Sequence, residues 1–492
     1  MRIRTVGIFA AAMVMVTVMI CAGAGVSGIA GAAGAGSASS VVKSTSQEQT
    51  NIEVTVYNGN IGLVKDVRSV TLPPGKGELR FMDVAARINP VTVHVRSVNA
   101  PDSLVVLEQN YEYDLMDENK LLDKYVGKKI RIIEDNKYQD RKDTVEAELL
   151  SNNNGQIYRI GGEIYLGHPG IKVLPELPDN LIARPTLTWL YDNKAAKPHS
   201  VEVSYITGNI TWKADYVLVL DRYDKKADLS GWVTVDNKSG AAYRDAALKL
   251  VAGEVNRAKD EDYERPMRVY KAAASREYAP APSFEEKSLF EYHIYTLQRR
   301  TTLKENQTKQ ISFIDAPGAS ASKDYIAYGI QSWFSSAFKD TNPRQPVNVY
   351  VRFKNSRDNS LGMPLPGGIM RLYKKDDEGS LQFIGEDRIK HTPKDEEIKL
   401  KVGEAFDIAV ERSQTDFKQL TSKQYESEWE ITLRNHKDED ITVQLIEPLF
   451  GTWQVLPGAP KYTKLDANTI RFDVAVPKDK EVKVKYRVRV GY

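Results

Sequence analysis

Hydrophobic and polar side chains alternate one by one along most of this chain of 492 residues. A period of two places the two sets on opposite faces of a β-sheet, one buried and one in water. The alternation recurs at 52–57, 91–96 and 347–353, and turn clusters such as 73–75 and 152–155 separate the short runs. The sequence therefore predicts a mainly β fold of antiparallel β-sandwich domains with few helices. The pattern is clearest near the C-terminus, where Val482, Val484, Tyr486, Val488 and Val490 alternate with Lys483, Lys485, Arg487 and Arg489.

Two β-hairpins are predicted in the last part of the chain. In the first, the polar turn 435–440 separates the alternating runs 429–433 and 441–445. In the second, the turn 477–480 joins the run 470–476 to the last strand. Polar turn residues between two alternating runs are the usual signal of a hairpin.

One helix is predicted over 114–126, at the start of a unit spanning 114–177. Asp114 or Asp117 can cap its first turn, and Gly127 suits the left-handed residue after its end. Four or five short strands are expected after it, and such a unit can close as a small SH3-like barrel. Apolar pairs at four-residue spacing support the helix, namely Leu121 with Tyr125 and Leu122 with Val126.

Residues 1–36 are typical of a secretory signal peptide, with two arginines, an apolar stretch over Val6–Ile20 and a small-residue exit. The alternative is an uncleaved N-terminal anchor, because apolar and small residues continue long enough to span a bilayer. Cys21 is the only cysteine, so removal of the signal excludes a disulfide framework and a cysteine nucleophile. We expect a secreted, periplasmic or cell-surface protein that touches a membrane only through this segment, if the segment is retained.

The rest of the chain divides by composition and turn signals. The segment after residue 256 is charged, contains several prolines and lacks alternation, so it is predicted to be a disordered insert. It is either a tolerated solvated insertion or a loop for partner binding or cleavage. The predicted divisions are a polar leader at 37–50, an N-terminal β domain at 51–113, the helix and barrel at 114–177, the first part of a β-sandwich at 178–256, the insert at 257–288, and the continued sandwich with its C-terminal hairpins at 289–492.

Charge and motifs exclude several kinds of chemistry. The 68 basic and 66 acidic residues leave a net charge of +2, which gives no case for nucleic-acid binding. Phosphate loops, dinucleotide fingerprints and nucleophile elbows are missing from the sequence, and no two of the six histidines stand at metal-ligand spacing. Two clusters were weighed as cation sites, although solvated turns explain them better: Asp387, His391 and Asp395, and His436 with Asp438, Glu439 and Asp440. No catalytic, cofactor-binding or metal-ligating residue is assigned, and no cofactor is expected.

An ordered set of short motifs runs from about Arg184 to Tyr492. The motifs are 211–216, 230–240, 250–256, 292–297, 365–368, 385–389 and 433–436. Their succession resembles a bacterial domain of unknown function that also occurs in mucoidy inhibitor A-like proteins. The resemblance implies an exported or envelope-associated β-rich protein with no established catalytic residues. The long coiled coil of the mucoidy-inhibitor-like members has no counterpart here, so their link to surface polysaccharide is not carried over.

Folding alone accounts for the distinctive residues of these motifs. Trp212 and Trp232 are expected to fill a sandwich core, Gly231 and Gly253 to allow bulges or close strand approach, and 237–240 to form a turn. The sequence therefore favours a non-enzymatic binding or structural protein of the cell envelope. Its partner would be an unknown envelope protein or polysaccharide. The alternatives are an envelope hydrolase acting on glycans or peptides, and an adhesion or assembly subunit whose basic last strand lies at a sheet edge.

Overall fold

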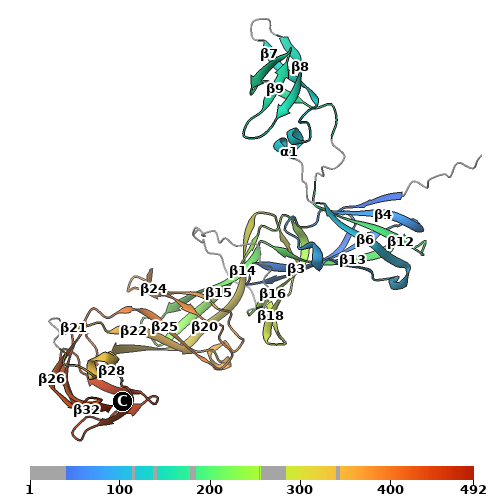
Figure 1. Ribbon diagram of the computed structural model, residues 1–492. Helices are drawn as coiled ribbons and strands as arrows, with labels where there is room; N and C mark the ends of the chain where they lie inside the picture. Colours follow the sequence, from blue (N-terminus) through green and yellow to red (C-terminus); the bar gives the residue numbers. More distant parts are fainter. Residues whose placement is uncertain are drawn as a thin grey trace, which may run out of the picture. The chain divides into compact units, whose positions relative to one another are not determined.

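The computed structural model describes residues 40–112, 117–136, 141–177, 184–253, 255, 284–338 and 344–491. Within them the chain is mainly β, with five sheets and one α-helix, which confirms the predicted fold class (Figure 1). The predicted signal segment, Cys21 and most of the predicted insert lie outside the described residues.

Two sheets combine strands from before residue 113 with strands from after residue 184. The first has the order β1 (Ser40–Ser44), β4 (Gly75–Met82), β12 (Thr186–Asn193) and β6 (Leu104–Glu112). The second has the order β17 (Phe284–Leu289), β18 (Tyr292–Leu297), β16 (Tyr243–Ala252), β2 (Gln49–Tyr57), β3 (Ile61–Val70), β13 (His199–Gly208) and β5 (His94–Ser97), and β19 (Thr301–Leu303) also pairs with β16. Most pairs are antiparallel, but β1 with β4 and β2 with β16 are parallel.

The third sheet is centred on β20 (Gln307–Tyr328), which pairs with β15 along its first part and with two other strands along its last part. Its order is β24 (Leu381–Ile389), β23 (Gly368–Lys375), β14 (Ile210–Leu220), β15 (Lys226–Asn237), β20, β28 (Ile441–Pro448), β31 (Thr469–Val476) and β30 (Thr463–Lys464), and β22 (Asn348–Lys354) pairs with both β20 and β25 (Glu397–Glu404). One large core joins these three sheets and includes Trp189, Trp212 and Phe313.

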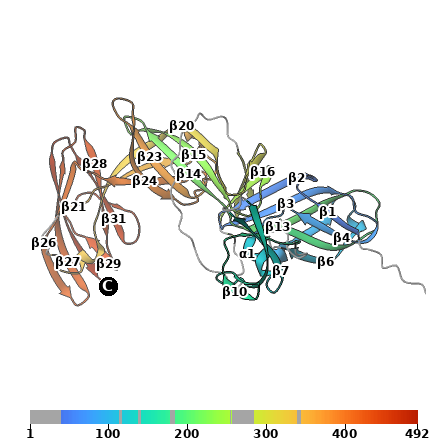
Figure 2. The ribbon, with the colours of Figure 1, turned by 90° about the horizontal axis from the view of Figure 1, so that it is seen from above.

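The last sheet packs on β28 and β31 to form a C-terminal sandwich. Its order is β21 (Arg344–Gln345), β26 (Ile408–Thr421), β27 (Gln424–Asn435), β32 (Glu481–Gly491) and β29 (Thr452–Val455) (Figures 1 and 2). The side chains between the layers form a second core around Trp429, Phe472 and Tyr486.

Both predicted C-terminal hairpins are wrong, although all their strands exist. β27 and β28 do not pair with each other, because β27 joins β26 and β32 whereas β28 joins β20 and β31. The second predicted hairpin fails in the same way, since β31 pairs with β28 and β32 pairs with β27. Each turn therefore carries the chain from one layer of the sandwich to the other. A hairpin does occur nearby, between β26 and β27.

The unit at 117–177 contains the predicted helix but no closed barrel. Helix α1 (Glu118–Asp123) is shorter than predicted, and Asp117 caps it by accepting a hydrogen bond from the Lys120 amide. Gly127 adopts the expected left-handed conformation, at φ 80°. The strands form an open antiparallel sheet, whose edge strands β10 and β11 do not pair with each other, so the barrel is not closed. Its order is β10 (Glu163–Leu166), β9 (Ile157–Ile160), β8 (Arg141–Ser151), β7 (Lys129–Asn136) and β11 (Ile171–Val173).

Three shorter segments also depart from the expectation. The predicted strand at 91–96 begins only at His94, because Pro90 starts a 3₁₀ turn that Asn89 caps, and Val91 is 88% exposed. Residues 40–44 and 49–50 of the predicted polar leader belong to β1 and β2. Residues 284–288 of the predicted disordered insert belong to β17.

Candidate functional site

The six histidines are dispersed through the described residues. His199 is buried, and its ring nitrogens lie 2.9 Å from Ser97 Oγ and 3.0 Å from Asn193 Oδ1. Burial lowers its pKa, so the ring is a neutral member of the core. His168 and His293 each contact one glutamate, whereas His94, His391 and His436 are exposed.

The two clusters weighed as cation sites do not assemble. Asp387 accepts hydrogen bonds from the backbone amides of Arg388 and Lys401, and His391 accepts one from Gly367. In the second cluster, Asp438 and Asp440 contact Lys478 instead of converging with the other members. The described part of the chain contains no group of three or more potential metal ligands.

Among the distinctive motif residues, Trp212 and Gly231 serve packing, whereas Trp232 does not. Trp212 is buried and donates from its indole nitrogen to the Val251 carbonyl oxygen. A Cβ on Gly231 would lie 2.5 Å from Ile314 Cγ2, at a register shift between β15 and β20. Trp232 is only half-buried, so it does not fill the core as expected.

The last strand is not a free edge along its whole length. β29 covers Val488–Gly491 of β32, and Lys483 and Lys485 both form ion pairs with Glu430 on β27. The edge position expected for an assembly subunit is therefore wrong for Val488–Gly491, whereas Glu481–Lys485 pairs only with β27 among the described strands.

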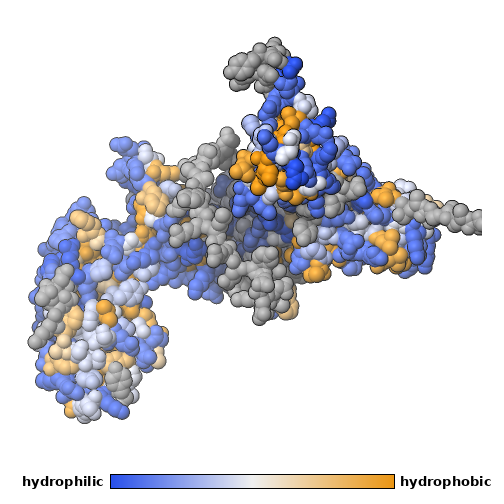
Figure 3. Space-filling model, turned by 45° about the horizontal axis from the view of Figure 1, so that its top comes forward, coloured by the Kyte–Doolittle hydropathy of each residue, from blue (hydrophilic) through white to orange (hydrophobic). Residues whose placement is uncertain are grey.

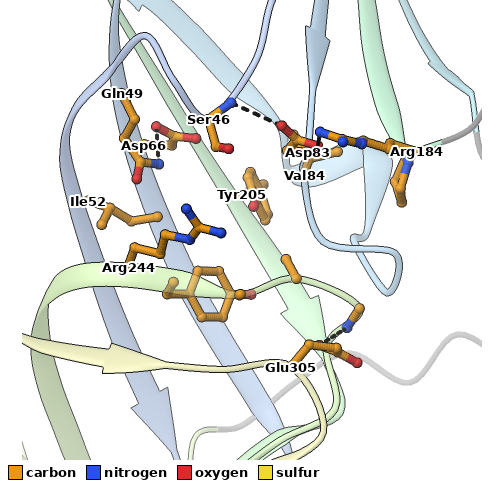
Figure 4. Close-up of a pocket in the computed structure, with 15 residues that line it drawn as sticks. Ser46, Gln49, Ile52, Asp66, Asp83, Val84, Arg184, Tyr205, Arg244 and Glu305 are labelled. Atoms are coloured by element: carbon orange, nitrogen blue, oxygen red, sulfur yellow. Dashed lines mark hydrogen bonds and ion pairs between the residues drawn. The ribbon is translucent and has the colours of Figure 1, made fainter.

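A polar cavity of about 340 Å³ lies where β2, β3 and β13 meet the turn at 240–244. Figure 4 shows Gln49, Asp66 and Arg244 on one side of it, with Asp83 and Arg184 on the other. The residues come from eight separate stretches of the chain. These are the β1–β2 connection, β2, β3, the residues after β4, the segment before β12, β13, the turn at 240–244 and the turn around Glu305. Its lining contains neither histidine nor cysteine.

The negative charge of Asp66 is neutralised by Arg68, a buried residue that does not line the cavity. Both Nε and Nη2 of the fully buried Arg68 donate to Asp66 Oδ2, at 3.1 and 2.8 Å, and Gln49 donates to Oδ1 at 2.8 Å. The Arg68 guanidinium also lies 3.5 Å from the ring centre of Phe81. This carboxylate has no spare charge to offer a ligand.

Asp83 is held as a carboxylate. Burial opposes its ionisation, but hydrogen bonds from the Ser46 amide and from Arg184, at 3.0 and 2.9 Å, outweigh that effect and lower its pKa. Asp83 and Arg184 therefore neutralise each other on this side of the cavity.

Glu305 and Arg244 are the two lining charges without an opposite partner. Burial raises the pKa of Glu305, although the backbone amides of Gly240 and Ala241 partly offset it; the Gly240 bond is 2.9 Å long. The exposed Arg244 side chain forms no hydrogen bond or ion pair with any described residue, and it extends across the cavity toward Tyr205 (Figure 4).

A second cavity, of about 550 Å³, adjoins the first. The two share Pro185, Gly240 and Glu305 among their lining residues. Gly240 forms the boundary, because its backbone is so close to Ala86 that a Cβ there would lie 2.3 Å from Ala86 Cβ. The remaining lining of the second cavity is polar or cationic, with Arg87, Tyr111, Asn209, Lys238 and Asn306.

Sequence reasoning missed this site almost entirely. The sequence marks Gly240 only as part of a predicted turn, and Arg184 only as the start of the range that resembles the family. No local pattern marks Asp66, Glu305 or Arg244, because each stands alone in its own segment.

Outside the cavities, the face in view in Figure 3 is mostly hydrophilic, with separate apolar patches. The most exposed apolar side chains, such as Phe406 and Leu166, belong to different sheets or turns. In the part of the chain that the structure describes, no helix has the length and apolar character needed to cross a membrane.

A family model described as a domain of unknown function (DUF4139) matches residues 201–492. The matched range begins in β13 and includes every strand of the C-terminal sandwich. No curated protein matches the chain.

Proposed function

This chain belongs to the family of the domain of unknown function DUF4139, and from that premise we propose that it is an exported binding protein of the cell envelope without catalytic activity. The cavity between β2, β3, β13 and the 240–244 turn carries this proposal. Two of its three carboxylates are neutralised within the protein, and the third accepts backbone hydrogen bonds. Such a site presents fixed polar groups to a ligand, and its lining holds no histidine or cysteine to act as base or nucleophile.

Blocking the cavity tests the proposal. Ala242 lines the cavity and is exposed, so Ala242→Trp would fill the space with little cost to folding. Ala475→Trp, on an exposed position of β31, is the matched control. We expect the wild type and the control to retain ligands from a library of envelope glycans and peptides that Ala242→Trp does not retain.

The bound ligand should also keep its mass during prolonged incubation, because the proposed role includes no turnover. Equal retention by all three proteins would contradict a binding role for the cavity. Cleavage of the ligand would contradict the non-enzymatic part.

One observation favours the hydrolase alternative. The pKa values of Glu305 and Asp83 are displaced in opposite directions within one cavity, as they are in an acid and nucleophile pair of a glycosidase. In that case Glu305→Gln would abolish the release of reducing ends from envelope glycans. An absence of release by the wild type would eliminate the alternative.

A further inference from the structure

The two adjoining cavities together have the form of one groove with a narrow middle. Their volumes, about 340 and 550 Å³, both lie within the range of small-ligand sites, roughly 300–1,000 Å³. Pro185, Gly240 and Glu305 line both cavities, and the Gly240 amide donates a hydrogen bond to Glu305 at this point. A ligand longer than one cavity could therefore occupy both by passing over this point.

Each half of the groove contains one arginine whose charge is not neutralised. Arg244 in the first half and Arg87 in the second are exposed, and neither guanidinium has a hydrogen-bond or ion-pair partner among the described residues. The other cations are occupied, Arg184 by Asp83 and Lys238 by Asp236. The charges left for a ligand therefore favour two anionic groups, one in each half.

A planar guanidinium is suited to bidentate pairing with a carboxylate. Uncharged polar side chains line both halves and match the hydroxyl groups of a sugar: Ser46 and Gln49 in the first half, Asn209 and Asn306 in the second. Tyr111 adds an aromatic ring to the second half, where sugar rings can pack.

The strand arrangement leaves an extended peptide little backbone to pair with. β3 is paired on both sides, with β2 and with β13. β2 lacks a second neighbour beside the first cavity only at Gln49–Ile52, because its pairing with β16 begins at Glu53. A peptide could therefore add there only as a very short strand.

We propose that the groove binds an acidic oligosaccharide, with one sugar carboxylate at Arg244 and another at Arg87. This proposal rests on the binding role proposed above and specifies its ligand. Glu305, at the narrow middle, would then lie between the two carboxylates and contact a sugar hydroxyl.

Titration calorimetry of the full chain with galacturonate and digalacturonate tests this assignment. The methyl esters of both sugars are matched neutral probes. Arg244→Gln should weaken binding of the monomer and the dimer by at least about tenfold, because each loses a charge-assisted contact. Arg87→Gln should weaken only the dimer, by a similar factor.

Arg222→Gln is the matched control, since Arg222 is exposed in the β14–β15 turn and lines neither cavity. All three variants should unfold at the wild-type temperature, because the substituted arginines of the groove form no polar contact within the described residues. The esters should bind at least about tenfold more weakly than the acids, and higher salt should reduce this difference.

Several outcomes would overturn the proposal: esters that bind as well as the acids, variants that leave the affinity for digalacturonate unchanged, triglutamate that binds as tightly as digalacturonate, or no binding of any acidic sugar. If acidic sugars fail but Ala242→Trp still abolishes retention of another ligand, the ligand assignment is wrong and the binding role stands. If Ala242→Trp has no effect on any ligand, both fail.

Discussion

The buried ion pair of the C-terminal sandwich gives the sharpest prediction about stability. Arg412 on β26 and Glu447 on β28 are both fully buried, and two short bonds, of 2.6 and 2.9 Å, join them. Arg412 also lies 5.2 Å from the ring centre of Trp333 and within 3.4 Å of the Tyr486 hydroxyl. Because β26 and β28 belong to different sheets, the pair connects the two layers.

Removing one partner should be far more damaging than removing both. Burial alone would lower the pKa of Arg412, but the Glu447 carboxylate outweighs that effect and raises it, so the arginine stays charged. Glu447→Gln keeps the shape but leaves this charge without its counterion. The expected loss is about 3–5 kcal/mol of the free energy of unfolding. Replacing both residues, as Arg412→Met with Glu447→Leu, should restore most of that loss.

Urea unfolding followed by tryptophan fluorescence measures the effect. With a slope of about 2 kcal/mol/M, a loss of 3–5 kcal/mol lowers the midpoint by about 1.5–2.5 M. Hydrogen exchange of the β26 and β28 amides shows that the change belongs to this sandwich and not to another part of the chain. Glu430→Gln, which removes two exposed ion pairs on β27, is the control and should shift the midpoint far less.

The reasoning fails if Glu447→Gln lowers the free energy of unfolding by less than about 1 kcal/mol, because a buried charge without a counterion destabilises the folded state by more than that. It also fails if the double variant is as unstable as Glu447→Gln. The double variant has no unpaired charge, so its loss of stability would come from altered packing.

Three further predictions concern other parts of the fold. Glu305→Gln should stabilise the protein at pH 7–8, because the raised pKa of Glu305 means that its ionisation opposes folding. This gain in stability should vanish below pH 4.5, the ordinary pKa of a glutamate. Thermal melts in which the variant is less stable than the wild type at every pH would contradict the prediction. Gly231→Ala should lower the free energy of unfolding by about 1–3 kcal/mol, because the new methyl group would lie 2.5 Å from Ile314 Cγ2. An unchanged midpoint of urea unfolding would contradict this, because it would show that β20 moves to accommodate the methyl group. Asp117→Ala should cost about 1 kcal/mol and speed hydrogen exchange in α1, whereas Asp117→Asn, which can still accept from the Lys120 amide, should not.

Much of the local structure could be read from the sequence. The alternation at 482–490 predicted the buried face of β32, where Val484, Tyr486, Val488 and Val490 are all buried. Asp117 marked the start of α1, Gly127 a left-handed residue, although α1 already ends at Asp123, and Gly231 marked a bulge. These signals are local, because a strand's faces and a helix cap depend only on neighbouring residues.

Which strands pair with each other could not be predicted from neighbouring residues. β27 and β28 would bury the same faces whether they formed a hairpin or crossed between layers, so periodicity cannot separate the two arrangements. The buried pair Arg412–Glu447 shows the difference, because its two residues face each other only when the strands lie in opposite layers.

The order of residues along the chain is enough to predict β-strands, the buried side of most of them, and the family to which residues 201–492 belong. Only the folded chain shows which strands are neighbours, that the sheet at 129–173 stays open, and that Arg244 and Arg87 line two adjoining cavities that share Glu305. The difference arises because side-chain periodicity records burial, which each strand shows separately. A binding site depends on distances between strands far apart in the chain, and only the packed core sets those distances.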